Sequence, residues 1–146
     1  MAAHTHGMHV LIVDDYPDAL DIWAIYLRSL GYRVSTAVDG AEAIAQAERL
    51  RPDIIVLDLE LPGVSGFEAA RHIRSFPETQ HIPLVAATGY SHARQLALAR
   101  ESGFDRVVVK PCDPDQLVAE IEELLRRSEL MSRRADLAVV RAHKNG

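Results

Sequence analysis

The sequence predicts an α/β protein in which helices cover both faces of a five-stranded parallel sheet. Short aliphatic runs alternate along the chain with longer amphipathic segments, and the connections between them are short. The run Ile54–Leu57 has no polar position, which is typical of a strand buried on both faces of a parallel sheet. Such alternation requires right-handed crossovers, which place helices on both sides of the sheet. With 146 residues and no internal repeat or linker, the chain suits one domain.

The individual elements follow from hydrophobic periodicity and from the residues that end it. Strands are expected at Val10–Val13, Tyr32–Ala37, Ile54–Leu57, Leu84–Ala87 and Val107–Val109. Helices are expected at 19–30, 40–50, about 65–76, 91–102 and 113–127, where apolar residues recur every three or four positions. Gly31 and Gly103 are the stop signals of the first and fourth helices. The expected topology is doubly wound and flavodoxin-like, with strand order 2-1-3-4-5.

The two ends of the chain lie outside this pattern. Residues 1–7 have no apolar periodicity and are predicted to form a disordered tail. Residues 128–146 are expected either to prolong the last helix or to fray. The folded domain is therefore predicted to span residues 8–127.

Composition excludes several classes of function. The formal net charge of -5 and the isoelectric point near 5.8 argue against a general binder of nucleic acids or membrane surfaces. A single cysteine, Cys112, excludes an internal disulfide and a cysteine-based zinc site. No apolar run approaches the roughly 20 residues of a membrane-spanning helix, and no export signal is recognisable. The expectation is a cytoplasmic protein.

Side chains that can take part in chemistry follow four of the five predicted strands. Asp14 and Asp15 follow the first strand, Asp58 the third, Thr88 the fourth and Lys110 the fifth. The carboxyl ends of parallel strands meet at one edge of the sheet, where ligands of doubly wound folds bind. The order 2-1-3-4-5 is therefore expected to bring these side chains together in one site.

This set of groups predicts phosphoryl transfer. Three neighbouring carboxylates repel one another, so a cation is expected to neutralise them. Mg²⁺ prefers oxygen ligands and is commonly held by one or two carboxylates together with a phosphate. An aspartate can attack phosphorus to form an aspartyl phosphate, while Mg²⁺ and a lysine neutralise the transferred group. A threonine hydroxyl can then donate a hydrogen bond to one of the new oxygens.

Each of these residues also has a simpler interpretation. Asp14 and Asp15 could cap the first helix, which has Pro17 in its first turn. Thr88 could be a turn residue, and Lys110 could be a surface lysine in an extended dipeptide. Their joint occurrence at successive strand ends favours a shared site.

With these residues in place, the chain resembles the receiver domain of two-component response regulators over about residues 8–127. The motifs that carry the resemblance are VLIVDD (10–15), IIVLDLELPGVSGFE (54–68), ATG (87–89) and VVVKP (107–111). Each motif is weak alone, and the specificity comes from their combination and spacing. The stretch ESGFDRVVVKPCDPDQL also resembles receivers that are attached to hybrid histidine kinases or work with them.

The resemblance implies a role for each site residue. Asp58 would be the phosphoacceptor, taking a phosphoryl group from a histidine kinase or a histidine phosphotransfer protein. Mg²⁺ would be held by Asp14, Asp15, Asp58 and the backbone carbonyl of Glu60. Thr88 would be the switch hydroxyl and Lys110 would bind the phosphoryl group. The peptide bond between Lys110 and Pro111 would be cis.

Three positions in or near the site modify these expectations. The family usually has an aromatic residue three positions before the lysine, where this chain has Val107. An aliphatic side chain cannot report activation by a large ring rotation. Glu60 and Tyr90, two residues after Asp58 and Thr88, are expected to flank the phosphoryl group and to tune its hydrolysis.

The expected function is a signalling module that switches partner binding on phosphorylation, without an attached DNA-binding output domain. The chain would be a stand-alone receiver or one detached from a hybrid kinase. It would show its changed surface, around the fourth helix, fifth strand and fifth helix, to an unknown downstream protein or a second copy. Self-phosphorylation and autodephosphorylation would be its only reactions.

Two alternatives remain from other functional classes. One is a phosphatase or phosphotransferase with an aspartyl phosphate intermediate. Enzymes of the haloacid-dehalogenase type have a second aspartate where this chain has Glu60, and no cap insertion is present. The other is a phosphorylation-independent adaptor on the same fold, which Val107 keeps open.

Overall fold

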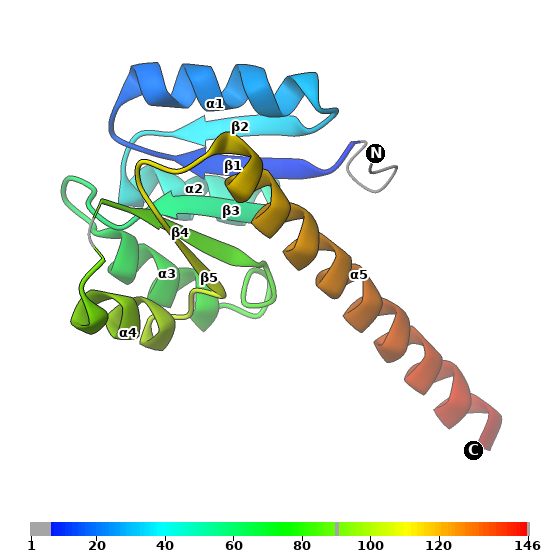
Figure 1. Cartoon of the computed structure of the whole chain (residues 1–146). Coiled ribbons are helices and arrows are strands. Elements are labelled where there is room, and N and C mark those ends of the chain that lie inside the picture. Colours follow the sequence, from blue (N-terminus) through cyan, green and yellow to red (C-terminus); the bar gives the residue numbers. More distant parts are fainter. Residues whose placement is uncertain (1–6, 90, 146) are drawn as a thin grey trace.

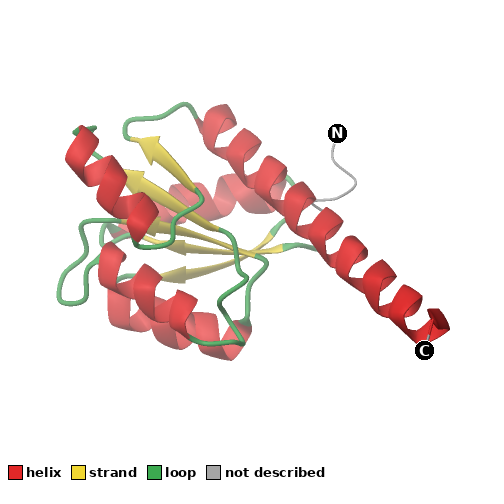
Figure 2. Cartoon of the chain, turned by 90° about the horizontal axis from the view of Figure 1, so that it is seen from below, coloured by secondary structure: helices red, strands yellow, loops and turns green. Residues whose placement is uncertain are grey.

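The computed structural model describes residues 7–89 and 91–145, and its centre is one parallel sheet (Figure 1). The strands are β1 (His9–Val13), β2 (Arg33–Ala37), β3 (Ile54–Asp58), β4 (Leu84–Thr88) and β5 (Arg106–Val109). Their order is β2-β1-β3-β4-β5, and every neighbouring pair is parallel. Figure 2 shows helices on both sides of this sheet. The predicted doubly wound topology is confirmed.

The helices agree with the predicted segments except at the end of the chain. They are α1 (Pro17–Ser29), α2 (Gly40–Leu50), α3 (Gly66–Ser75), α4 (Ala93–Glu101) and α5 (Pro114–Asn145). Past residue 127, helix α5 continues to Asn145 as part of one helix of 32 residues. Its distal half projects away from the sheet (Figure 1). Residues 1–6 of the predicted disordered tail lie outside the described part of the chain.

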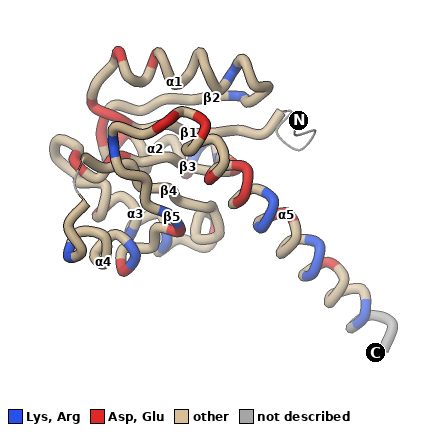
Figure 3. The backbone as a smooth tube through the Cα atoms, in the orientation of Figure 1, with Lys and Arg blue, Asp and Glu red and all other residues tan. Residues whose placement is uncertain are grey.

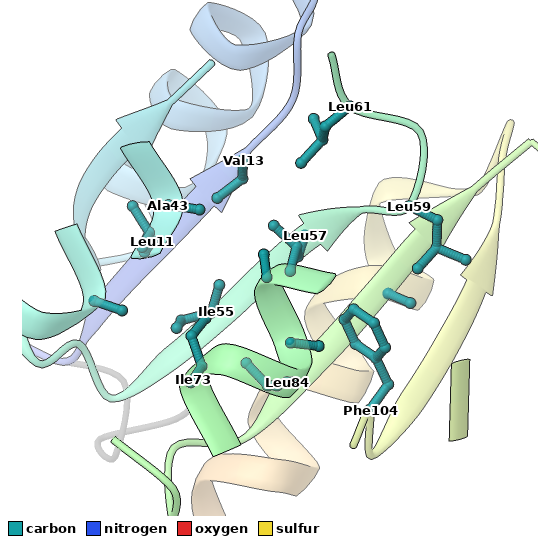
Figure 4. Packing of buried hydrophobic residues seen from close by; sticks show 14 of the residues in the cluster. Leu11, Val13, Ala43, Ile55, Leu57, Leu59, Leu61, Ile73, Leu84 and Phe104 are labelled. Atoms are coloured by element: carbon teal, nitrogen blue, oxygen red, sulfur yellow. The ribbon is translucent and has the colours of Figure 1, made fainter. Parts of the chain in front are cut away.

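The core consists of two hydrophobic clusters, one on each face of the sheet. The first lies between the sheet and helices α2, α3 and α4, and includes Leu57, Leu84 and Phe104 (Figure 4). The second lies under α1 and α5 and includes Val56 and Ile121. Successive residues of β3 point into opposite clusters, so every position of that strand is buried. This explains the apolar run before Asp58.

The connection from β3 to α3 is compact because of one glycine. Gly66 begins α3, and a Cβ atom at this position would overlap the backbone carbonyl of Asp58. The preceding Ser65 caps the helix, since its hydroxyl accepts a hydrogen bond of 3.2 Å from the backbone N–H of Glu68. The backbone N–H of Gly66 also donates to the Leu59 carbonyl at 3.0 Å, so the start of α3 is tied to the backbone immediately after Asp58.

Helix α5 changes character along its length. In its first part, Leu117, Ile121 and Leu124 are buried against the sheet, as their helical spacing predicts. In its distal part the large apolar side chains are each at least half exposed, namely Leu130, Met131, Leu137, Val139 and Val140. Figure 3 shows basic residues recurring along this distal part. None of the helices in the described residues is long and apolar enough to cross a membrane.

Candidate phosphorylation site

The carboxyl edge of the sheet brings the predicted site residues together. Strand register aligns Asp58 with Ala87 and Thr88 with Val109. The backbone N–H of Lys110 then donates to the Thr88 carbonyl at 2.7 Å, which carries the β4–β5 pairing one residue further. The acidic residues of the loops gather at this edge in Figure 3.

Asp14, Asp15 and Asp58 form an acidic cluster at this edge. One carboxylate oxygen from each lies within 4.8 Å of those of the other two. Asp14 and Asp58 are buried, whereas Asp15 is exposed. The cap of α1 is Tyr16, which makes no side-chain cap hydrogen bond, while Asp14 accepts from the Tyr16 backbone N–H at 3.0 Å. The simpler interpretation of Asp14 and Asp15 as helix caps is therefore wrong.

Lys110 reaches into this acidic cluster. Its Nζ atom lies 2.9 Å from Asp14 Oδ2 and 3.2 Å from Asp58 Oδ2. Burial by itself lowers the pKa of Lys110, but its hydrogen bonds and charge interactions with the two aspartates outweigh burial and raise the pKa. Lys110 is thus held as an ammonium between two carboxylates and is not a free surface lysine.

The environment of Asp58 opposes its ionisation in the absence of a further cation. Burial raises the pKa of Asp58, and the charge of Asp14 adds to this effect. The backbone N–H of Glu60, 3.1 Å from Asp58 Oδ1, and the Lys110 ammonium lower the pKa but do not cancel the rise. A divalent cation at this carboxylate would supply the missing compensation.

The three carboxylates fit the requirements of such a cation. Hard oxygen ligands from the acidic loop after β1 and from the end of β3 suit Mg²⁺, which keeps several waters and uses few protein ligands. The cluster contains three carboxylates and one ammonium among the described residues, so a net negative charge is left for a metal to neutralise. The donor set therefore supports binding of a divalent cation.

Glu60 connects the acidic cluster to Thr88. Its Oε1 atom accepts a hydrogen bond of 2.9 Å from the Thr88 hydroxyl, which is fully buried. Sequence reasoning placed both residues at the site but missed this contact. Glu60 lies two residues after the end of β3 and Thr88 is the last residue of β4, so the β3–β4 pairing brings the two side by side.

The remaining predicted positions surround the site. Val107 is partly buried and packs against the first hydrophobic cluster, to which Phe104 also belongs. The Lys110–Pro111 peptide bond is cis, as predicted. Cys112 is partly buried and packs against the second cluster. Tyr90 lies outside the described residues.

The doubly wound fold, with an acidic cluster and a lysine at its carboxyl edge, is the arrangement expected from the resemblance to receiver domains. Residues 10–122 match the Response regulator receiver domain family, and the chain belongs to this family. Receiver domains are signalling modules of two-component systems rather than turnover enzymes.

Curated relatives include both response regulators and a sensor kinase. The DNA-binding response regulator MtrA of Mycolicibacterium smegmatis is 36% identical over 125 residues, which are 86% of this chain and 54% of MtrA. The CAI-1 autoinducer sensor kinase/phosphatase CqsS of Vibrio cholerae is 38% identical over 80% of this chain and 17% of CqsS. The chain spans about half the length of the response regulators that it matches.

Solved structures of similar proteins have the same fold. Chemotaxis protein CheY4 of Vibrio cholerae is 29% identical with a TM-score of 0.77, covering 81% of this chain and 98% of CheY4. The receiver domain of sensor histidine kinase PA1611 from Pseudomonas aeruginosa is 33% identical with a TM-score of 0.72, covering 83% of this chain and 96% of that one. That structure contains a magnesium ion coordinated in its active-site cleft. Receivers of histidine kinases are thus among the structural neighbours.

Proposed function

We propose that Asp58 accepts a phosphoryl group from the phosphohistidine of a histidine kinase or histidine phosphotransfer protein. The observation that carries this proposal is the position of Asp58. Its buried carboxylate lies at the carboxyl edge with the Lys110 ammonium at 3.2 Å and two further carboxylates beside it. Membership in the receiver family supports the same function.

The transfer follows from the contacts of the Asp58 carboxylate. One of its oxygens attacks phosphorus and forms the O–P bond, while the P–N bond to the donor imidazole breaks and that nitrogen keeps the electron pair. The Glu60 backbone N–H orients the carboxylate through Oδ1. Lys110, already 3.2 Å from Oδ2, is placed to neutralise the phosphoryl oxygens.

We assign the metal site to Asp14, Asp15, Asp58 and the backbone carbonyl of Glu60, with Mg²⁺ as the ion. When bound, Mg²⁺ neutralises charge on the transferred phosphoryl group. The magnesium ion in the related PA1611 receiver supports this choice.

Phosphorylation is proposed to change the surface formed by α4, β5 and α5. Thr88 is the last residue of β4, which pairs with the edge strand β5. Movement of the Thr88 hydroxyl would therefore change the packing next to β5. A downstream protein, or a second copy in a homodimer, would bind there.

Glu60 and Tyr90 are proposed to tune hydrolysis, so their alanine variants should change the decay rate of the phosphorylated form.

The decisive experiment compares two aspartate-to-asparagine variants. Wild-type protein is incubated with a small phosphodonor and Mg²⁺, and phosphoryl incorporation is measured by mass spectrometry of the intact chain. Labelling is expected in wild type and in Asp53→Asn, at the opposite edge of the sheet, and is expected to be absent in Asp58→Asn. Equal labelling of Asp58→Asn would overturn the proposal.

A phosphorylation-independent adaptor is the second candidate. Val107 favours it, because an aliphatic side chain packed on the first cluster offers no ring to rotate. Unchanged partner binding and cellular output in Asp58→Ala would support the adaptor.

A further inference from the structure

The contacts of Glu60 reach both Asp58 and Thr88. Its backbone N–H donates to Asp58 Oδ1 at 3.1 Å, and its side-chain Oε1 accepts from the Thr88 hydroxyl at 2.9 Å. Thr88 is fully buried, whereas the Glu60 side chain is exposed, in the loop between β3 and α3. One loop residue therefore contacts the phosphoacceptor and also the hydroxyl proposed to respond to phosphorylation.

We propose that the Glu60 carboxylate is a latch that holds Thr88 in the unphosphorylated arrangement and is displaced by the phosphoryl group. This inference rests on the proposed phosphorylation of Asp58. Glu60 is a positioning residue in this scheme, because it acts through Thr88 and leaves the reacting atoms to Asp58 and Lys110.

Hydrogen-bond stoichiometry makes the Glu60 carboxylate and a phosphoryl oxygen competitors for the Thr88 hydroxyl. A hydroxyl has one proton to donate, so Thr88 can satisfy the Glu60 carboxylate or a phosphoryl oxygen with a full hydrogen bond, but not both. An ionised acceptor makes a stronger hydrogen bond than a neutral one, so the Glu60 contact is a substantial competitor. Activation must break this bond before Thr88 can turn to Asp58.

Electrostatics favours the exchange once Asp58 is phosphorylated. A phosphoryl group carries about -1.5 to -2 charges and three acceptor oxygens. Like charge repels the Glu60 carboxylate, which is tied by its own backbone to Asp58. The same event thus offers Thr88 a new acceptor and drives the old acceptor away.

The latch also gives the signal a route that does not need a rotating aromatic ring. Val107 is packed on the first cluster, but the Glu60 side chain is already exposed and can leave Thr88 without unpacking the core. Its release changes the surface of the β3–α3 loop and frees the end of β4. The two loops would therefore change together on phosphorylation.

The test is a double-mutant cycle with beryllium trifluoride, a non-covalent stand-in for the phosphoryl group. Its affinity at saturating Mg²⁺ is measured by fluorine NMR in wild type, Glu60→Ala, Thr88→Ala and the double variant. Loss of the competing hydrogen bond is expected to tighten binding in Glu60→Ala by about two- to tenfold. Glu60→Gln, which keeps a neutral acceptor, should tighten it less. In the Thr88→Ala background the gain from Glu60→Ala should shrink.

Matched controls separate the latch from general charge effects and from the proposed function. Glu68→Ala removes an exposed glutamate from the first turn of α3 and should leave the affinity unchanged. An unchanged affinity in Glu60→Ala would overturn the latch, as would an equal gain with and without Thr88, since that gain would come from charge alone. Failure of wild type to bind, or equal binding by Asp58→Asn, would instead overturn the phosphorylation of Asp58. Circular dichroism verifies that each variant is folded.

Discussion

Polar side chains lie at both ends of the strands, at the amino-terminal ends (the amino edge) and at the carboxyl-terminal ends (the carboxyl edge). Their surroundings differ between the two edges. At the amino edge, the Asp53 carboxylate accepts a hydrogen bond of 2.7 Å from the backbone N–H of His9. The His9 ring shares a hydrogen bond of 2.7 Å with the Ser35 hydroxyl. At the carboxyl edge, three carboxylates lie close together and Lys110 pairs with two of them, and burial raises the pKa of Asp58 despite Lys110.

The difference separates polar groups that stabilise the fold from groups that await a ligand. At the amino edge, Asp53 and His9 exchange short hydrogen bonds and the His9 ring is paired with Ser35, so these groups do not need an added ion for compensation. The carboxyl edge keeps repelling charges close together, at a cost in stability that a metal ion and a phosphoryl group can relieve. Variants at matched positions of the two edges can therefore test this division.

The largest expected effect is at Lys110. Replacing Lys110 by alanine removes the ammonium that neutralises the transferred group, and labelling by a small phosphodonor should slow by about 10²-fold. The measurement is the initial labelling rate at saturating Mg²⁺. Arg127→Ala, which removes an exposed cation paired with Glu123, should label normally. A normal rate in Lys110→Ala would show that the ion pairs of Lys110 are only structural.

Metal binding should also distinguish the edges. Asp14→Asn is expected to weaken Mg²⁺ binding by at least about tenfold, the cost of losing even an outer-shell partner. Trp23 is the single tryptophan and lines a cavity together with Asp14 and Lys110, so its fluorescence can report binding. Asp53→Asn should bind Mg²⁺ like wild type. Equal affinity in all three proteins would place the metal elsewhere.

At the amino edge the expected effect is on stability alone. Asp53→Ala leaves the backbone N–H of the buried His9 without its side-chain acceptor and should lower the free energy of unfolding by about 1 kcal/mol. Urea unfolding measures the change, and Asp53→Asn, which keeps an acceptor oxygen, should lose less. Phosphodonor labelling of folded Asp53→Ala should not change. Reduced labelling would contradict the division between the edges.

The smallest effect concerns pH. In metal-free protein, acidification is expected to lower stability through His9 at the amino edge and to raise it through Asp58 at the carboxyl edge. Burial, followed by the charge of Arg33, lowers the pKa of His9. The unfolded chain therefore takes up the proton first, and stability is lost as pH falls through the unfolded histidine value near 6.5. Asp58 has a raised pKa, so the folded state binds its proton more readily and stability is gained as pH falls through that raised value.

Unfolding midpoints measured in a chelator between neutral and acidic pH test these signs. His9→Gln should lose less stability than wild type as the pH falls below neutral. Asp58→Asn should be more stable than wild type at neutral pH and should lack the gain on acidification. A less stable Asp58→Asn at neutral pH would show that the Lys110 ion pair outweighs the burial of the Asp58 charge.

Much of the site could be predicted because parallel strands convert sequence order into spatial order. Asp58 and Thr88 are the last residues of β3 and β4, and Asp14 and Lys110 directly follow β1 and β5. The carboxyl ends of these parallel strands meet at one edge of the sheet. Burial could not be predicted in the same way. Asp14 and Asp15 are adjacent in sequence, yet one is buried and the other is exposed. The direction of each side chain depends on how the loop leaves β1.

The sequence by itself determined the strands, the helices, the parallel α/β class and the set of reactive residues, since periodicity and stop signals are local properties of the chain. Only the tertiary structure decided the length of α5, because the residues after Arg127 have helical character but no buried stripe that requires a helix. It also decided that the Glu60 carboxylate accepts a hydrogen bond from the Thr88 hydroxyl, which depends on the loop after β3 meeting the end of β4. Such a contact joins residues 28 positions apart, and no local pattern records it.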